Sequence, residues 1–350
     1  MRRVNVTSKS PVHRDRTVRR RGPEPPAANA SGRRKTAAAS PAIALPTDAD
    51  TVEIRAAARA IRLTNLRKVF WPTLGLTKRD LLQYYADVAP ALLPHVRERA
   101  VVMKRYPNGA AQPFFFMKRV PEPHPAWLDL CPIEHESGSV IRFPIIQDLL
   151  SLLWVVNLGC IDLNQWYARC DDVDRPDYVH FDLDPVTGET AVPFERLREA
   201  ALTVRDALQT LDMPAYVKTT GSRGFHVYVP IARGPTQKEV WTFAKRVALA
   251  LAATYPALLT AEYRIAKRLP GRVLVDYNQN AWGRTLASVY SVRPHPRALV
   301  SAPVTWDEVA HGVRLDEFHI GNVPDRVRRL GDLWAPVAAG KKRVRLPAVG

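Results

Sequence analysis

Two carboxylates separated by one residue, Asp182 and Asp184, lie at the end of an apolar run, Tyr178 to Asp184, that is typical of a β-strand. Alternate side chains of a strand leave the same face, so both carboxylates should reach one site while Phe181 and Leu183 point into the core. Two acids on one face repel each other unless a cation lies between them, and Mg²⁺ or Mn²⁺ prefers such oxygen ligands. A solvated strand end would also explain the pair, which is weak evidence when taken alone.

A third acid, Asp276, lies near the end of another predicted strand, Arg272 to Tyr277, whose Val273 and Val275 face the opposite way. If the two strands are neighbours, three carboxylates meet. Such a group around two cations is the arrangement that supports in-line phosphoryl transfer in polymerases and nucleases. We therefore predict that Asp182, Asp184 and Asp276 are catalytic and hold two Mn²⁺ or Mg²⁺ ions.

The segment KTTGSRGFHVYV, residues 218–229, lies between the two acidic strands. Its glycines allow backbone amides to approach an anion, and Ser222, Arg223 and His226 supply donors beside them. It is a candidate cradle for a triphosphate, although a hairpin turn with a surface arginine and a sheet histidine would look the same. Arg268, Arg284 and Arg293 flank the third acid and could neutralise phosphate charge. A triphosphate site favours nucleotide addition over phosphodiester hydrolysis.

The elements around these residues predict an α+β fold. Strands are expected at 178–184, 215–220, 225–231 and 272–277, and helices at 194–211 and 240–253. This order is the split βαβ arrangement, an antiparallel sheet with its helices on one face. The preceding part contains a helix at 77–93, which Thr77 and Asp80 begin as a capping box, and an apolar helix at 145–158 that stops at Gly159.

Composition restricts the class of partner. The 350 residues carry 51 Lys and Arg against 34 Asp and Glu, a net charge of +17 that favours nucleic acid or another polyanion. No apolar run approaches the roughly 20 residues that span a bilayer. Three cysteines, Cys131, Cys160 and Cys170, form no CxxC pair, so neither a zinc site nor a disulfide framework is expected, and a reducing cytosol is the default compartment.

The ends of the chain differ in composition from its middle. Residues 1–50 are rich in Arg and Pro and poor in large apolar side chains, which predicts a disordered basic arm. Such an arm fits a transit peptide, a nucleic-acid tether or a tail without a function. Residues 338–350 are predicted to be a solvated basic tail, and residues 51–337 to be the folded domain.

Three motifs together, HFDLDP at 180–185, GSRGFHVYV at 221–229 and VDYNQN at 275–280, resemble those of the archaeo-eukaryotic primase superfamily. Within it, the chain is similar to the polymerase domain of the bacterial end-joining enzyme ligase D. The likeness begins at TNLRKVFWP (64–72), passes through KRYPNG (104–109) and WVVNLGC (154–160), and reaches SAPVTWDE (301–308), so it covers nearly all of 51–337.

The resemblance implies a primase-like fold: an RRM-like catalytic core, residues 176–337, packed with an N-terminal α/β part, residues 51–175, that contacts DNA ends and template. It implies nucleotide-binding roles for Ser222, Arg223, His226, Arg268, Arg293 and Asn164, with Lys104 and Arg105 on DNA. Asn65, Lys68 and Lys78 match a pocket for the 5′-phosphate of a downstream strand, and Phe115 and Phe116 match an aromatic pair that stacks on template bases. Alternatively, Phe115 and Phe116 are two phenylalanines of the hydrophobic core.

One position departs from the family. Many relatives have Glu-Leu-His where this chain has Asp162-Leu163-Asn164, and asparagine can donate a hydrogen bond but carries no positive charge. This segment and RTLAS at 284–288 resemble stand-alone actinobacterial relatives, and the length leaves no room for a fused ligase or nuclease domain.

We therefore expect a stand-alone primase-polymerase, cytoplasmic and associated with a bacterial nucleoid. It would add nucleotides, with ribonucleotides preferred, at short gaps or ends of DNA in non-homologous end joining or excision repair. The expected partners are gapped or broken duplex DNA with a 5′-phosphate, NTP or dNTP, a separate DNA ligase and Ku, with no membrane. The alternatives are a metal-dependent nuclease that uses the same carboxylates and a non-catalytic module that binds DNA ends.

Overall fold

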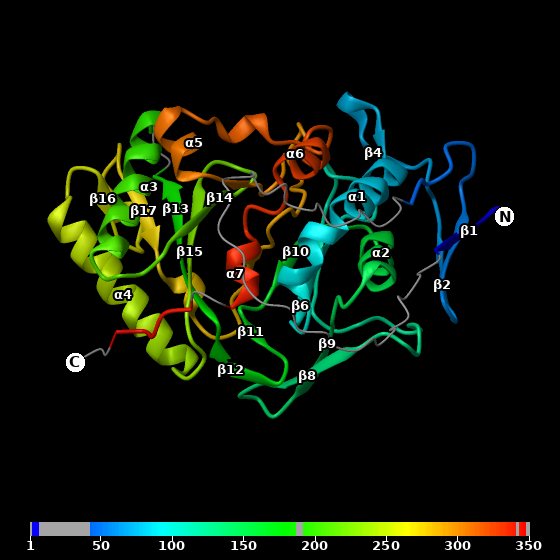
Figure 1. Cartoon of the computed structure of the whole chain (residues 1–350), viewed down its shortest axis with the longest axis horizontal. Coiled ribbons are helices and arrows are strands. Elements are labelled where there is room, and N and C mark those ends of the chain that lie inside the picture. The colour runs from blue at the N-terminus through cyan, green and yellow to red at the C-terminus, as the bar shows by residue number, and fades with distance from the viewer. Residues whose placement is uncertain (1, 7–42, 187–191, 341–342, 348–350) are drawn as a thin grey trace, which may run out of the picture.

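The computed structural model describes residues 2–6, 43–186, 192–340 and 343–347, and they form a mixed α and β fold, as predicted (Figure 1). The largest sheet has six strands, in the spatial order β16 (Leu259–Thr260), β17 (Val273–Asp276), β13 (Tyr178–Pro185), β15 (Phe225–Pro230), β14 (Tyr216–Thr219) and β19 (Pro303–Val304). Apart from the parallel pair β16 and β17, neighbouring strands are antiparallel. The central order β17-β13-β15-β14 places the strand of Asp276 directly beside the strand of Asp182.

Two helices, α3 (Phe194–Gln209) and α4 (Gln237–Thr254), cover one face of this sheet. The alternation along β13 explains the arrangement. Val179, Phe181 and Leu183 are fully buried on the helix side, while His180, Asp182 and Asp184 leave the other face. The acidic residues therefore point away from the helices, toward the rest of the molecule.

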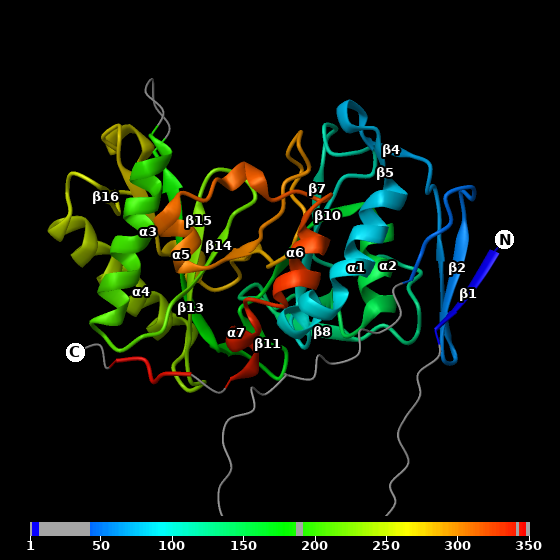
Figure 2. The same ribbon diagram turned by 45° about the horizontal axis from the view of Figure 1, so that its top comes forward.

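The second large sheet lies across from that face and has the order β18 (Leu286–Ala287), β10 (Cys160–Gln165), β6 (Val101–Arg105) and β7 (Phe115–Met117). Helices α1 (Lys78–Val96) and α2 (Leu149–Asn157) pack together beside it (Figure 2). One continuous hydrophobic core joins both sheets and their helices. The two sheets are thereby held at a fixed separation, and the site lies between them.

The capping box of the first helix was predicted correctly, and the start of the second helix was not. Thr77 caps α1 and forms the capping box with Asp80. The second helix begins at Leu149 rather than at 145, because Asp148 caps it and Ser151 closes a second capping box. Gly159 follows α2 with a φ of +82°, and a side chain there would lie 3.2 Å from the backbone of Pro107.

Smaller elements complete the chain. They are the strand pairs β4 (Val69–Trp71) with β5 (Leu76–Thr77), β8 (Leu130–Glu134) with β9 (Val140–Pro144) and β11 (Ala168–Arg169) with β12 (Asp172–Pro176), a sheet of β1 (Arg2–Val6), β2 (Val52–Ala56) and β3 (Arg59–Leu63), the helices α5 (Trp306–His311), α6 (Val323–Leu330) and α7 (Ala335–Ala339), and the 3₁₀ turns Pro72–Leu74, Ile265–Lys267, Asn278–Asn280 and Leu315–Glu317. Within the described parts of the chain, no helix is both long enough and apolar enough to cross a membrane.

Residues 1–50 were predicted to be a disordered arm, but both ends of this segment are ordered in the structure. Residues Arg2–Val6 form strand β1, which pairs in parallel with β2. Ile43 and Leu45 are buried in the core, because the side-chain amide of Gln83 on α1 bonds the backbone of both. The rest of the predicted arm, residues 7–42, lies outside the described residues.

The C-terminal segment also packs where a solvated tail was predicted. Val344 pairs with Ile231 beside β15, and Arg343 reaches the carboxylate of Asp177, which is 1% exposed. Arg99 and Arg169 bond the same carboxylate, at 2.7 and 3.1 Å. Burial opposes ionisation of Asp177, but the three guanidinium groups, Arg99 foremost, hold its pKa below the ordinary value. The tail is thus anchored by a buried network of charges.

The expectation of no disulfide is also wrong for this structure. Cys131 on β8 and Cys170, which follows β11, are joined by a disulfide with their Cα atoms 5.7 Å apart. The 38 residues between them form no recognisable motif, and the two cysteines meet because Cys131 packs in one apolar cluster with Cys170 and with Val173 of β12. Cys160 is free and buried.

We predict that Asp177→Ala lowers the free energy of unfolding by about 3 to 5 kcal/mol, because it leaves buried arginines without their shared carboxylate. Urea unfolding monitored by circular dichroism measures the change. The matched control is Asp171→Ala, which breaks an exposed pair with Arg233 and should cost less than about 1 kcal/mol. Equal losses from the two variants would contradict a stabilising role for the network.

Candidate active site

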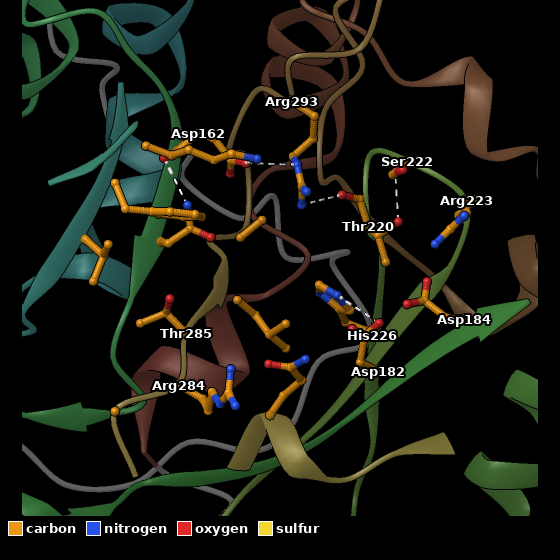
Figure 3. Close-up of a pocket in the computed structure, with 18 of the residues that line it drawn as sticks. Asp162, Asp182, Asp184, Thr220, Ser222, Arg223, His226, Arg284, Thr285 and Arg293 are labelled. Carbon is orange, nitrogen blue, oxygen red and sulfur yellow. Dashed lines mark hydrogen bonds and ion pairs between the residues drawn. The ribbon is translucent and has the colours of Figure 1, made fainter. Parts of the chain in front are cut away.

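A cavity of about 560 Å³ lies between the two large sheets (Figure 3). Strands β13 and β15 supply Asp182, Asp184 and His226 to one wall, and β6, β10 and β7 supply the opposite wall. Ten of the residues predicted to act at the site line it: Lys104, Phe116, Asn164, Asp182, Asp184, Ser222, Arg223, His226, Arg284 and Arg293. The split of these residues between two sheets shows why no single segment of sequence contains the site.

The carboxylates of Asp182 and Asp184 share the sheet face that sequence alternation predicted. Burial raises the pKa of each to about 7, helped by the charge of Asp276 on Asp182 and by the charge of Asp182 on Asp184. No described lysine or arginine lies within ion-pair distance of either carboxylate. A buried acid and a partly buried acid that repel each other and form no ion pair with a described lysine or arginine fit a divalent cation.

Asp276 occupies the position on β17 directly paired with Asp182 on β13. Its carboxylate is turned to its own strand end, where it accepts hydrogen bonds from Tyr263 Oη, from the Asn278 amide at 2.8 Å and from Gln279 Nε2 at 3.1 Å. Among the described residues, no group of three or more His, Cys, Asp or Glu side chains is placed to hold a metal ion. The strands therefore bring the third acid beside the first, and its side chain must turn for all three to share a cation.

The hairpin between β14 and β15 lies against the acidic strand, which explains its two glycines. A Cβ on Gly224 would lie 2.1 Å from the carbonyl oxygen of Leu183, and one on Gly221 would lie 2.6 Å from Cγ of Arg293. The amides of Ser222 and Gly224 donate to Thr220 Oγ1, at 3.2 and 3.1 Å. These two amides are thus used within the turn, and the residues Ser222 and Arg223 of the hairpin line the cavity.

Arg293 lines the cavity and contacts both the hairpin and the opposite sheet. It donates to the carbonyl of Thr220 at 3.1 Å, and its Nε lies 3.3 Å from Asp162 Oδ2 (Figure 3). The same oxygen of Asp162, a residue that is 1% exposed, lies 3.8 Å from Nζ of Lys104. From the sequence, Asp162 was only part of the segment that departs from the family, and no role was predicted for it. An acid between the apolar residues Ile161 and Leu163 of a strand could have indicated that Asp162 is buried beside a cation.

Lys218 is a second residue without a predicted role. It pairs with His226 across β14 and β15, is 1% exposed, and places its Nζ 2.7 Å from Nδ1 of His226. Burial and the charge of Arg293 lower its pKa well below the ordinary value. Lys218 is the only charged residue of the strand β14, and this pattern could have indicated a buried lysine with a specific partner.

The aromatic pair lies on β7 at the rim of the cavity. Phe115 and Phe116 are 43% and 60% exposed, so they are not core residues. Phe116 pairs with Lys104 and lines the cavity, while Phe115 pairs with Arg105 and faces the other way. The sequence left Phe114 aside, but it is 47% exposed and lies against Phe116 with Nζ of Lys104 4.2 Å from its ring centre. This surface offers flat rings beside cations.

Asn65, Lys68 and Lys78 lie at the start of α1, away from the cavity lining. The amide of Lys78 donates to the carbonyl of Lys68, and Asn65 has a φ of +57° in the turn before it. Lys78 is buried and donates to Thr64 O, while Lys68 bonds Asn108 at 2.8 Å. Burial and the nearby charge of Lys68 lower the pKa of Lys78 to about 8. Adjacent cations at a helix N-terminus favour an anion.

Three arginine predictions have different outcomes. Arg284 lines the cavity with Arg293. Arg268 is absent from the lining and instead bonds the carbonyls of Glu262 and Tyr263 in its own loop. Arg105 bonds Leu158 O and stacks on Phe115. Arg268 and Arg105 thus hold local structure in this conformation.

Comparison with known proteins follows from this geometry. Residues 77–334 match the family model described as LigD, primase-polymerase domain. The chain is 37% identical over 281 residues to the multifunctional non-homologous end joining protein LigD of Mycolicibacterium smegmatis, and 30% identical over 296 residues to that of Pseudomonas aeruginosa. These matches cover 80% and 83% of this chain but only 36% and 34% of the relatives' length.

A solved structure gives the same result. The polymerase domain of Mycobacterium tuberculosis ligase D, in complex with DNA, superposes with a TM-score of 0.74 at 32% identity. The alignment covers 80% of this chain and 98% of that one. The likeness thus extends over nearly the whole of one domain of a longer protein.

We predict that Asp184→Asn raises the free energy of unfolding by about 1 to 3 kcal/mol when no divalent cation is present, since it removes a buried charge that Asp182 repels. Thermal unfolding in excess EDTA measures the change. Asp206→Asn, on an exposed helix face, is the control and should stay within about 0.5 kcal/mol. A loss of stability in the Asp184 variant would show that its charge is compensated in the folded protein.

Proposed function

The chain belongs to the LigD primase-polymerase domain family of nucleotidyltransferases, and we propose that it adds nucleotides at short gaps or ends of DNA. The observation that supports this proposal most is the single cavity that contains a buried pair of acids on one wall and Ser222, Arg223 and Arg293 beside them. Hydrolysis of a phosphodiester needs no cradle for a leaving pyrophosphate. The cationic hairpin therefore favours synthesis.

Asp182 and Asp184, joined by Asp276 once its carboxylate turns, would hold the divalent cations, two Mn²⁺ or Mg²⁺ ions. When bound, such ions activate the attacking 3′-hydroxyl and stabilise charge on the leaving group. The protein's own contribution is to keep two carboxylates on one face without a competing lysine or arginine. Their buried, repelling charges are relieved when the ions bind.

Ser222, Arg223 and Arg293 would bind the triphosphate, with Arg284 and His226 beside them. Asp162 keeps Arg293 directed toward the hairpin, and Thr220 O accepts a further bond from it. Asn164 lies on the same wall, where its Nδ2 bonds the carbonyl of Asp162 at 3.1 Å. The Asn164 side chain supplies a polar contact without charge where relatives have histidine.

DNA would lie along the side of the cavity that β7 forms. The exposed rings of Phe115 and Phe116 would stack on template bases, a contact of roughly 1 to 3 kcal/mol per base. Lys104 and Arg105 would supply positive charge beside the rings. Asn65, Lys68 and Lys78 would take the 5′-phosphate of the downstream strand. Under this proposal most DNA contacts come from residues 51–175 and the catalytic acids from residues 176–337, while Asn164 of the first part reaches the nucleotide.

The biological setting that we propose is the repair of DNA breaks by non-homologous end joining, with a preference for ribonucleotides and with a separate ligase and Ku as partners. The relatives are named for end joining. Excision repair would use the same gap-filling chemistry. The protein would act in the cytoplasm, on nucleoid DNA.

Two other functions deserve a test. A nuclease could use the same carboxylates, and a gapped duplex with labelled nucleotide distinguishes it because the product then shortens instead of lengthening. A non-catalytic module that binds DNA ends would incorporate nothing with any divalent cation. The cationic hairpin beside the acids favours the polymerase over both.

We predict that Asp182→Ala combined with Asp184→Ala abolishes nucleotide addition and leaves binding to a gapped duplex within about twofold, because the proposed DNA contacts are made by other side chains, on β6, β7 and the start of α1. Primer extension with Mn²⁺ and a gel-shift assay measure the two properties. Asp206→Ala serves as the control and should extend normally. Extension by the double variant would rule out the proposed catalytic acids.

We further predict that Lys68→Ala weakens binding to a gap with a 5′-phosphate by about fivefold to tenfold, and binding to the gap without it by less than twofold. Lys68 is the better probe than the buried Lys78, whose loss would also disturb the fold. Fluorescence anisotropy at fixed salt measures both affinities. Lys238→Ala, on α4, is the control; an equal loss on both gaps from Lys68→Ala would mean that this lysine adds only sequence-independent charge.

A further inference from the structure

A second cavity, of about 440 Å³, is lined by acidic and aromatic side chains and shares no lining residue with the active site. Strand β8 and the turn after it supply Glu134 and Glu136, and β12 supplies Asp174. Helix α4, which packs against β12, contributes Trp241, and Trp282 follows the 3₁₀ turn after β17 (Figure 1). Four separate segments of the chain thus form this acidic cavity.

The carboxylates of the acidic cavity have no cationic partner within the protein. Among the described residues, no lysine or arginine forms an ion pair with Glu134, Glu136 or Asp174, and all three are exposed. Lys238 of α4 is the one positive charge in the described lining. The lining is therefore net negative in a chain whose net charge is +17. Such a site repels the phosphates of DNA and of nucleotides and attracts a cation.

The arrangement of the lining fits an organic cation better than a metal ion. No group of three or more His, Cys, Asp or Glu side chains in the described parts of the chain is placed to hold a metal ion, so these acids do not converge on one point. The volume falls within the roughly 300 to 1,000 Å³ that is usual for pockets of small organic ligands. Trp282 is 39% exposed, and the face of an indole ring attracts a cation.

Gln237 adds an unused hydrogen-bond acceptor to the lining. It is the first residue of α4 and is 1% exposed, and within the described part of the chain its Oε1 has no hydrogen-bond partner. A buried acceptor without a donor destabilises the folded protein, so a ligand that brings an N–H group is favoured. A guanidinium group has five such donors in one plane, and it also stacks on aromatic rings and pairs with carboxylates.

We propose that the acidic cavity binds an arginine side chain that a basic segment of a partner protein presents. Further positive residues of such a segment would lie near carboxylates that are spread over β8, β12 and the turn between β8 and β9. Trp282 lines the acidic cavity and the next residue, Gly283, lines the active-site cavity, so the partner would be held next to the active site. The proposal uses none of the catalytic or nucleotide-binding residues and is independent of the proposed nucleotide chemistry.

Peptide binding to the full chain, without DNA or nucleotide, tests the ligand. The probe is the peptide GRGRGRG with a neutral fluorophore, and fluorescence anisotropy measures its affinity. The same peptide with citrulline in place of arginine has a similar shape but no charge and should bind at least about tenfold more weakly, and the lysine peptide about threefold more weakly. Equal affinity for the arginine and citrulline peptides, or for the arginine and lysine peptides, would overturn the assignment of a guanidinium group.

Charge variants test the cavity itself. Glu136→Gln and Asp174→Asn should each weaken peptide binding by about threefold, and together by about tenfold, because each removes one exposed carboxylate. Lys238→Met removes the positive charge of the lining and should strengthen binding by about twofold. Glu199→Gln makes the same charge change on the exposed face of α3 and is the matched control. Retained binding in the double variant, or an equal loss in Glu199→Gln, would contradict the proposal.

The aromatic contact and the location of the peptide have their own tests. Trp282→Leu keeps an apolar contact with Trp166 and should weaken binding by about threefold. If this variant does not fold, the exposed acids still decide. Asp184→Asn should bind the peptide as the wild type does, and a loss there would place the peptide in the active site instead. Glu136→Gln and Asp174→Asn should extend a primer normally, so a wild type that extends no primer would remove the proposed function and leave the peptide result unaffected.

Discussion

The mutual repulsion of buried carboxylates is the constraint around which this molecule is organised. Asp182 and Asp184 leave one face of β13, and Asp276 is paired with Asp182 from β17. An isolated hairpin could not keep Asp182 and Asp184 ionised together, because burial and repulsion both favour the protonated forms of these two acids. A six-stranded sheet, backed by α3 and α4 and fixed by one continuous core, supplies the rigidity that holds them. The site is therefore a strained charge arrangement that a divalent cation would relieve.

The cations of the cavity are arranged so that they do not neutralise these acids. Arg293 and Lys104 are both directed to Asp162 on the opposite sheet, and Asp162 is almost fully buried there. This partner lowers the cost of placing two positive charges inside the protein while it keeps them on the far wall. Arg293 and Lys104 thus pair with Asp162 and not with the acids, whereas Arg223 lies on the hairpin beside the acids.

Local signals in the sequence predicted the acidic strand, the hairpin, the capped helix α1 and most of the cavity residues, because strand alternation and capping depend on neighbours along the chain. The roles of Asp162 and Lys218 could not be predicted in this way. Each contacts residues from other strands, and those contacts exist only once β10, β14 and β15 are assembled. The packed C-terminal segment escaped prediction for the same reason, since its anchor Asp177 lies 166 residues away from Arg343.

The two glycines of the hairpin were predicted to matter for the site, but the structure gives them a different physical role. The sequence suggested that they free backbone amides for an anion, yet the amides of Ser222 and Gly224 are taken by Thr220. What the glycines permit is contact: Gly224 lies against the backbone of Leu183, and its added Cβ would be 3.1 Å from Asp184 Oδ1. Gly221 allows Arg293 to pass equally close. Because the turn lies directly on the acidic strand, its side chains and the carboxylates form one unit, and a displacement of either would move both.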